Sequence, residues 1–152
     1  MGDDVTTISD LEIMAKTVWG ESRGDGPAGM EAVAHVILNR AEAAQAYIKN
    51  NDRIRHPLFG NGTITHACKA RWQFSCWNDD DPNLDKMARL TLDDKVFCDC
   101  IQTALKVIMG AVDFTGGALH YYAKSMKKPP AWHKGEKPSY ETLQHIFFNN
   151  IK

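Results

Sequence analysis

Apolar residues recur with the 3.6-residue period of an α-helix along the first third of the chain. The first helical segment is expected to begin at Ser9 or Asp10, because either side chain can cap a helix. Its apolar positions are Leu11, Met14, Ala15 and Val18. The glycines and proline at 24–27 end this segment, and the proline suits the first turn of a second helix, which is expected to reach Tyr47.

Two further helix patterns follow in the second half of the chain. Asp81 can cap a short helix that ends near Leu90. Asp93 or Asp94 can cap a longer helix that ends at Gly110, a residue type that commonly follows the end of a helix.

Two other segments carry different patterns. Residues 56–78 are rich in glycine, threonine and aromatic residues without a helical period, which predicts loops and short strands. The last segment is expected to form a short helix from about Ser139, with Leu143, Ile146 and Phe147 on its apolar face.

Length and charge narrow the class of protein. The 152 residues suit a single domain, expected over residues 1–152 with a core at about 11–148. Lys and Arg number 18 and Asp and Glu 19, a net charge of −1, which argues against nucleic-acid binding. No apolar run reaches the roughly 20 residues of a membrane span. We therefore expect a monomeric α+β domain, predominantly α with a small irregular β part, and no stable membrane insertion.

The four cysteines do not have the spacing of metal-binding pairs or of a disulfide scaffold. Cys100 lies on an apolar stripe, which predicts a buried thiol. Cys68 and Cys76 flank the most aromatic segment and could form a disulfide only if that segment folds back on itself. The sequence leaves this pairing open and favours free thiols.

Glu21, close to the end of the first helix, is the first candidate for chemistry. It lies on the flank of the apolar stripe and near the unpaired carbonyls of the helix C-terminus, and both surroundings favour a protonated carboxyl. A protonated carboxyl near neutral pH is what a general acid requires. The alternative is a structural helix-end glutamate paired with Arg23 or Lys16.

Two aromatic segments are candidate binding sites. Residues 71–77 combine two tryptophans, a phenylalanine, a glutamine and a serine, which suits a sugar-binding groove and equally suits a core strand. Residues 113–122 carry paired glycines followed by a histidine and two tyrosines. His120 and His133 suggest zinc, but no HExxH motif or third ligand supports it, so we expect no metal and no cofactor.

Taken in this order, these segments resemble the SleB-like cell-wall hydrolases, which include spore-cortex-lytic enzymes and bacteriophage endolysins. The matching segments are TVWGESRGDGPAGMEAVAHVILNR (17–40), QFSCWNDDDPN (73–83), DFTGGALHYYAK (113–124) and PPAW (129–132). The first of them is the most specific.

The resemblance implies a lysozyme-like fold, similar to goose-type lysozymes and transglycosylases. It implies cleavage of peptidoglycan glycan strands between N-acetylmuramic acid and N-acetylglucosamine, by a lytic transglycosylase with Glu21 as its single catalytic acid. Such an enzyme leaves a 1,6-anhydro ring on the muramic acid. The candidate substrate-binding residues in the matching segments are Ser22, Gln73, Phe74, Ser75, Thr115, His120, Tyr121, Tyr122 and Trp132.

Three alternatives remain. A hydrolytic muramidase would use Asp25, Glu31 or Asp113 to assist a water, although Asp113 is favoured as the cap of a turn with Thr115. A non-catalytic peptidoglycan-binding module would use the same aromatic residues. A zinc amidase would require a metal.

The cellular context is inferred from the N-terminus. The segment MGDDVTTISD is acidic and lacks an apolar core, so we expect no signal peptide. This favours a bacteriophage endolysin that is made in the host cytoplasm and reaches the wall through a holin. The catalytic domain of a longer bacterial enzyme is the alternative.

Overall fold

The computed structural model describes residues 6–152, so residues 1–5 of the segment judged not to be a signal peptide lie outside the described residues. The helices are α1 (Ile8–Ser22), α2 (Gly26–Asn51), α3 (Ile64–Lys69), α4 (Pro82–Ala88) and α5 (Lys95–Ile108), with short 3-10 helices η1 (Ser75–Trp77) and η2 (Ala131–His133). The strands are β1 (His120–Ala123), β2 (Tyr140–Glu141) and β3 (His145–Phe148). The predicted α+β class, predominantly α, is confirmed.

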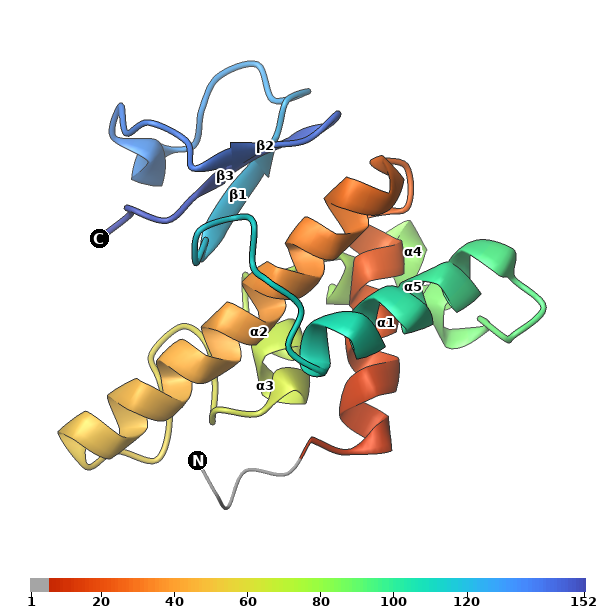
Figure 1. The fold of residues 1–152 in the computed structure, drawn as a ribbon, viewed down its shortest axis with the longest axis horizontal. Coiled ribbons are helices and arrows are strands. Elements are labelled where there is room, and N and C mark those ends of the chain that lie inside the picture. Colours follow the sequence, from red (N-terminus) through yellow and green to blue (C-terminus); the bar gives the residue numbers. More distant parts are fainter. Residues whose placement is uncertain (1–5) are drawn as a thin grey trace.

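The helices surround one hydrophobic core. Helix α1 contacts α2, α3 and α5, and α2 also contacts α5. The long helix α2 separates the small sheet from most of the other helices (Figure 1). Among the core residues, Met14, Val18, Val33, Ile37 and Phe147 are fully buried. The sheet therefore contributes to the same core as the helices.

The caps explain where the helices begin. Helix α1 starts at a capping box: the Thr7 hydroxyl accepts a hydrogen bond from the Asp10 N–H at 3.1 Å, and the Asp10 carboxylate accepts one from the Thr7 N–H at 3.0 Å. The predicted cap at Ser9 or Asp10 is therefore wrong by two or three positions. Asp81 and Asp94 cap α4 and α5 as predicted.

Asp10 also joins two helices. Its carboxylate accepts hydrogen bonds from the backbone N–H and the hydroxyl of Thr65 in α3. Burial on its own would raise the pKa of Asp10, but the hydrogen bonds from Thr65 and Thr7 outweigh it and hold that pKa below its ordinary value.

Two predicted segments have a different structure. Residues 56–78 contain the helix α3 in place of the expected strands, with one isolated bridge between His56 and Gly60. The expected helix from Ser139 is wrong, because this segment forms β2 and β3.

The apolar residues of the last strand, β3, resemble the pattern of a short helix because both faces of the strand are covered. Phe147 is buried in the helical core, while Phe148 packs against Trp132 and Tyr122. Leu143, expected on the apolar face, is 76% exposed. A strand covered on both faces shows consecutive apolar residues without alternation, so the pattern does not distinguish it from a short helix.

The sheet has the antiparallel order β1-β3-β2, so the last strand of the chain is its centre. Tyr121 pairs with Phe147 across β1 and β3, and Tyr140 pairs with Phe147 from β2. The rings of Tyr121 and Phe147 stack at 5.2 Å between centroids. The position of β3 therefore determines where Tyr121 lies.

A buried carboxylate attaches the sheet to the helices. Asp25, in the turn between α1 and α2, is 3% exposed. It accepts hydrogen bonds from the Thr142 hydroxyl and the Gln144 N–H, and its Oδ2 lies 2.9 Å from His145 Nδ1. A side chain at Gly29 would collide with this carboxylate, which explains a glycine inside the first turns of α2.

We expect Asp25→Asn to lower the free energy of unfolding by about 3 kcal/mol, because an amide cannot accept all the hydrogen bonds that the buried carboxylate accepts. Urea denaturation measures this change. Asp52→Asn is the matched control. Asp52 is exposed, and its backbone has a left-handed conformation (φ 50°) that asparagine also adopts. Equal stability of the two variants would contradict the attachment.

Candidate active site

Glu21 lies in the last turn of α1, between the sheet and η1. Its Oε1 accepts a hydrogen bond from the Tyr121 hydroxyl at 2.8 Å, and its Oε2 accepts one from the Cys76 N–H at 3.3 Å. The η1 segment can approach so closely because residue 20 is glycine. A Cβ there would lie 2.8 Å from both Cys76 Cβ and Met87 Sδ.

Tyr121 is a hydrogen-bond donor to Glu21 at neutral pH. Burial raises the pKa of its phenol well above the ordinary value, and the nearby Glu21 raises it further. The phenol therefore keeps its proton and holds one oxygen of the carboxylate in a fixed orientation.

A cleft of about 510 Å³ opens beside Glu21. It brings together residues from all three predicted segments. Of the candidate site residues, those that line it are Glu21, Gln73, Ser75, Tyr121, Tyr122 and Trp132. The segments are far apart in the sequence, so the fold assembles a single site from them. A role for these side chains in substrate binding stays a prediction.

Four other candidate residues do not line the cleft. Ser22 is 2% exposed and donates its hydroxyl to the Val18 carbonyl at 2.9 Å. Phe74 is 2% exposed and packs beneath Tyr121. Thr115 is fully buried in a turn and donates to Asp113 at 2.6 Å. His120 packs against Trp132. The structure therefore does not bring these four side chains into the cleft lining with the other candidates, and their role in substrate binding stays a prediction.

Trp72 also lines the cleft. It belongs to the candidate aromatic segment 71–77, although it was not among the individual residues expected to bind substrate. Its side chain is 78% exposed, and its backbone is left-handed at φ 70°, which is uncommon for a bulky residue. The Arg71 guanidinium lies 4.8 Å from the Trp72 ring. An exposed indole beside a cleft offers an apolar face to a sugar ring.

Sequence reasoning also missed Arg40, which lines the cleft from α2. It is 5% exposed, donates from Nε to the Leu119 carbonyl at 2.8 Å, and lies 4.8 Å from the Phe74 ring. Burial lowers its pKa to about 10, so the guanidinium is still charged at neutral pH. The available signal was its position four residues after Val36, on the apolar face of the helix.

Asn78 and His145 complete the polar lining of the cleft. His145 packs edge-on against Tyr121, with ring centroids 5.2 Å apart, and is oriented by Asp25. His145 was not selected as a site residue from the sequence, because the segment that carries it was expected to be helical.

The other candidate acids are occupied elsewhere. Glu31 pairs with Lys106 at 2.8 Å, and Asp113 accepts hydrogen bonds from the Thr115 N–H and from Asn39. Asp25 is enclosed by the β2–β3 hairpin. Within residues 6–152, Glu21 is the only acidic residue that lines the cleft.

Glu21 does not pair with Arg23 or Lys16, the structural role that was its alternative. Arg23 lies over the Trp19 ring at 3.9 Å and donates to Asn83, and Lys16 pairs with Glu12. Glu21 is therefore bound by neutral donors, Tyr121 and the Cys76 N–H.

The cysteines are free thiols in the structure, including Cys68 and Cys76. Burial raises the pKa of Cys68 to about 12 and that of Cys100 to about 12, so neither is a nucleophile at neutral pH. In the described part of the chain, no three His, Cys, Asp or Glu side chains are grouped as metal ligands. No helix among residues 6–152 is long and apolar enough to cross a membrane.

Comparison with known proteins identifies the family. A family model described as cell wall hydrolase matches residues 24–148. The chain belongs to the cell wall hydrolase family. Glu21 precedes the matched segment, so its assignment in this cell wall hydrolase rests on its position in the cleft. No curated protein sequence matches the chain.

Two solved structures resemble this cell wall hydrolase. The catalytic domain of the germination-specific lytic transglycosylase SleB from Bacillus anthracis has a TM-score of 0.67 and 26% identity, covering 95% of this chain and 98% of that one. The catalytic domain of the Bacillus cereus SleB protein has a TM-score of 0.69 and 26% identity, covering 95% and 93%. The predicted SleB-like resemblance and lysozyme-like fold are confirmed.

We expect Tyr121→Phe to lower the rate of peptidoglycan digestion about tenfold, because it removes one of the two donors that hold the Glu21 carboxylate. Turbidity clearance of purified cell walls measures the rate. Tyr140→Phe is the control, since Tyr140 packs on Phe114 and Phe147 and does not line the cleft. Equal rates for the two variants would exclude a role for the Tyr121 hydroxyl.

Proposed function

We propose that this cell wall hydrolase cleaves peptidoglycan glycan strands between N-acetylmuramic acid and N-acetylglucosamine as a lytic transglycosylase. The observation that carries the proposal is the single carboxylate of the cleft, that of Glu21. The similarity to a catalytic domain described as a lytic transglycosylase supports the same reaction.

Glu21 acts twice in this reaction. Protonated Glu21 donates its proton to the glycosidic oxygen, and the bond from that oxygen to C1 of muramic acid breaks. The 6-hydroxyl of the same sugar attacks C1, and the Glu21 carboxylate takes the hydroxyl proton. One C–O bond is lost, one is formed, and the enzyme regains its proton, so the step consumes no water.

The neighbours of Glu21 hold its carboxyl group in position for this cycle. The Tyr121 hydroxyl and the Cys76 N–H hold its two oxygens in place. The buried Arg40 guanidinium, which is still charged at neutral pH, lines the same cleft. Around them, Trp72 and Trp132 offer ring faces for the sugars, and Gln73 offers an amide for their hydroxyl and acetamido groups.

A hydrolytic muramidase with two carboxylates has less support. An inverting enzyme needs a second carboxyl about 6.5–9.5 Å from the acid, and a retaining one needs it at about 5–5.5 Å. Asp25, Glu31 and Asp113 all lie outside the cleft lining and are engaged by other protein groups.

We expect Glu21→Gln to reduce the release of anhydro-muramyl ends at least about a hundredfold, because an amide can neither donate nor accept the required proton. Mass spectrometry of digested peptidoglycan counts these ends. Glu12→Gln, an exposed position on the same helix, is the control and is expected to match wild type.

Mass spectrometry of the glycan ends, a pelleting assay and a chelator distinguish the alternatives. Reducing muramic ends from wild type would indicate a muramidase. Near-wild-type release by Glu21→Gln would remove the mechanism. Pelleting with peptidoglycan without any cleavage would indicate a binding module, and inhibition by a chelator would indicate a metal-dependent amidase.

We further propose that the protein is a bacteriophage endolysin, made in the host cytoplasm and acting on the wall as a monomer after release through a holin. The free thiols support folding in a reducing compartment. Expression in bacteria is then expected to cause lysis only with a co-expressed holin, followed as culture turbidity. Rapid lysis without the holin, or none with it, would contradict this route; Glu21→Gln is the control for activity.

A further inference from the structure

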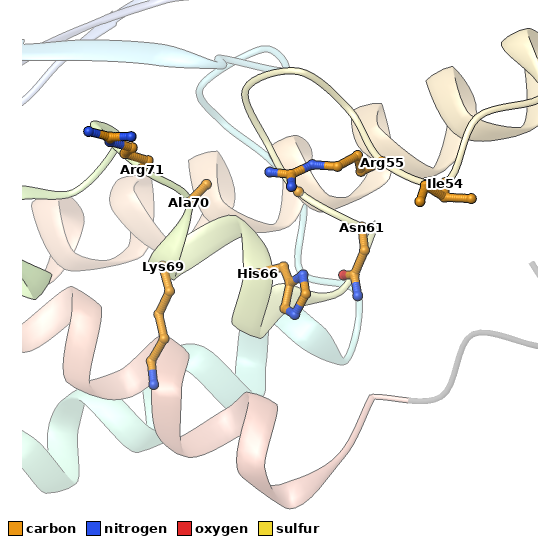
Figure 2. Close-up of a pocket in the computed structure, with 8 residues that line it drawn as sticks. Ile54, Arg55, Asn61, His66, Lys69, Ala70 and Arg71 are labelled. Atoms are coloured by element: carbon orange, nitrogen blue, oxygen red, sulfur yellow. The ribbon is translucent and has the colours of Figure 1, made fainter.

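A second pocket, of about 410 Å³, lies between the loop that follows α2 and the helix α3. Figure 2 shows Arg55 and Asn61 on the loop, His66 and Lys69 on α3, and Arg71 just beyond it. The mechanism described above uses none of these side chains.

The pocket is strongly basic although the protein is nearly neutral. The chain has a net charge of −1, yet residues 53–78 carry Arg53, Arg55, Lys69 and Arg71 and no acidic residue. No acidic residue lines the pocket among residues 6–152. Such a concentration of one sign of charge in a hollow attracts anions.

Two of the cations that line the pocket, Arg55 and Arg71, are available to a ligand. Lys69 is not counted with them, because its ammonium lies 4.7 Å from the Trp77 ring and points away from the other labelled side chains in Figure 2. Arg55 and Arg71 are exposed, and neither forms an ion pair within residues 6–152. Guanidinium groups bind carboxylates through two parallel hydrogen bonds.

The loop that forms the pocket is held in place by the protein. Gly60 has φ +88°, and a side chain there would lie 2.7 Å from His66 Cβ. His56 Nδ1 accepts hydrogen bonds from the N–H groups of Leu58 and Phe59, and Gln45 donates to the Gly62 carbonyl at 2.8 Å. The hollow is therefore preformed, which limits the entropy lost on binding.

The basic pocket adjoins the catalytic cleft. Arg71 lines the pocket and its neighbour Trp72 lines the cleft, with the guanidinium 4.8 Å from the indole ring. A sugar stacked on Trp72 would place its substituents next to Arg71. The anionic groups of a peptidoglycan strand are the carboxylates of the peptide stems attached to muramic acid.

We propose that the basic pocket binds the carboxylates of these peptide stems and so selects strands that carry them. This inference rests on the proposed function and deepens it by naming the part of the substrate that the pocket recognises. Arg55 and Arg71 bind the carboxylates, while Trp72 connects the pocket to the cleft.

The test compares two double variants on two substrates. Arg55→Gln with Arg71→Gln removes both available guanidinium groups. Arg89→Gln with Lys106→Gln is the matched control, removing the same charge from exposed positions outside the pocket. The substrates are intact peptidoglycan and glycan strands freed of their stems by an amidase, and the readout is kcat/KM for anhydro-end release.

The pocket variant is expected to lose about tenfold in kcat/KM on intact peptidoglycan and less than about twofold on stem-free strands. The control is expected to change less than about twofold on both. Equal losses on both substrates, or no loss on either, would overturn the proposal. So would a loss that disappears once phosphate polymers are stripped from the wall, because a phosphodiester would then be the ligand.

Peptide binding measured without cleavage tests the basic pocket separately from the proposed transglycosylase reaction. Calorimetry with a soluble stem peptide is expected to show about tenfold weaker binding to the pocket variant than to wild type, and no binding of a peptide whose carboxylates are amidated. Equal binding by both proteins would overturn the subsite. A wild-type protein that binds the peptide but cleaves neither substrate would contradict the proposed function alone.

Discussion

The attachment of the sheet to the α1–α2 turn through the buried Asp25 carboxylate is the constraint on which the site depends. Asp25 holds the β2–β3 hairpin, β3 is paired with β1, and β1 carries Tyr121. Tyr121 in turn donates to Glu21, four residues before Asp25. The orientation of the Glu21 carboxylate therefore depends on two contacts between segments at least 100 residues apart in the sequence, Tyr121 with Glu21 and His145 with Asp25.

The chemistry follows from how few charges the cleft contains. For the two proton transfers proposed above, the cleft offers one carboxylate, two neutral donors and one buried guanidinium. Of the other candidate acids, Glu31 pairs with Lys106 and Asp25 accepts hydrogen bonds that attach the sheet to the helices. A concentration of positive charge lies outside the cleft, in the pocket next to Trp72.

The sequence predicted what depends on local patterns. The helices α1, α2, α4 and α5 were expected from periodicity and caps, and Glu21 from its place at a helix end and from the family resemblance. The helix α3 was missed because six residues are too few to show a period, and β3 because both of its faces are covered. Arg40 and His145 could not be placed in the site before their tertiary partners were known, since each is defined by contacts with distant segments.

The most direct test of the lytic transglycosylase mechanism is the origin of the oxygen at the newly formed muramic acid ends. Digestion in water labelled with oxygen-18, followed by mass spectrometry, separates attack by the sugar's own hydroxyl from attack by solvent. With one carboxylate in the cleft, we expect anhydro-muramyl ends that contain no label. Muramic acid ends that are reducing and carry one labelled oxygen would contradict it.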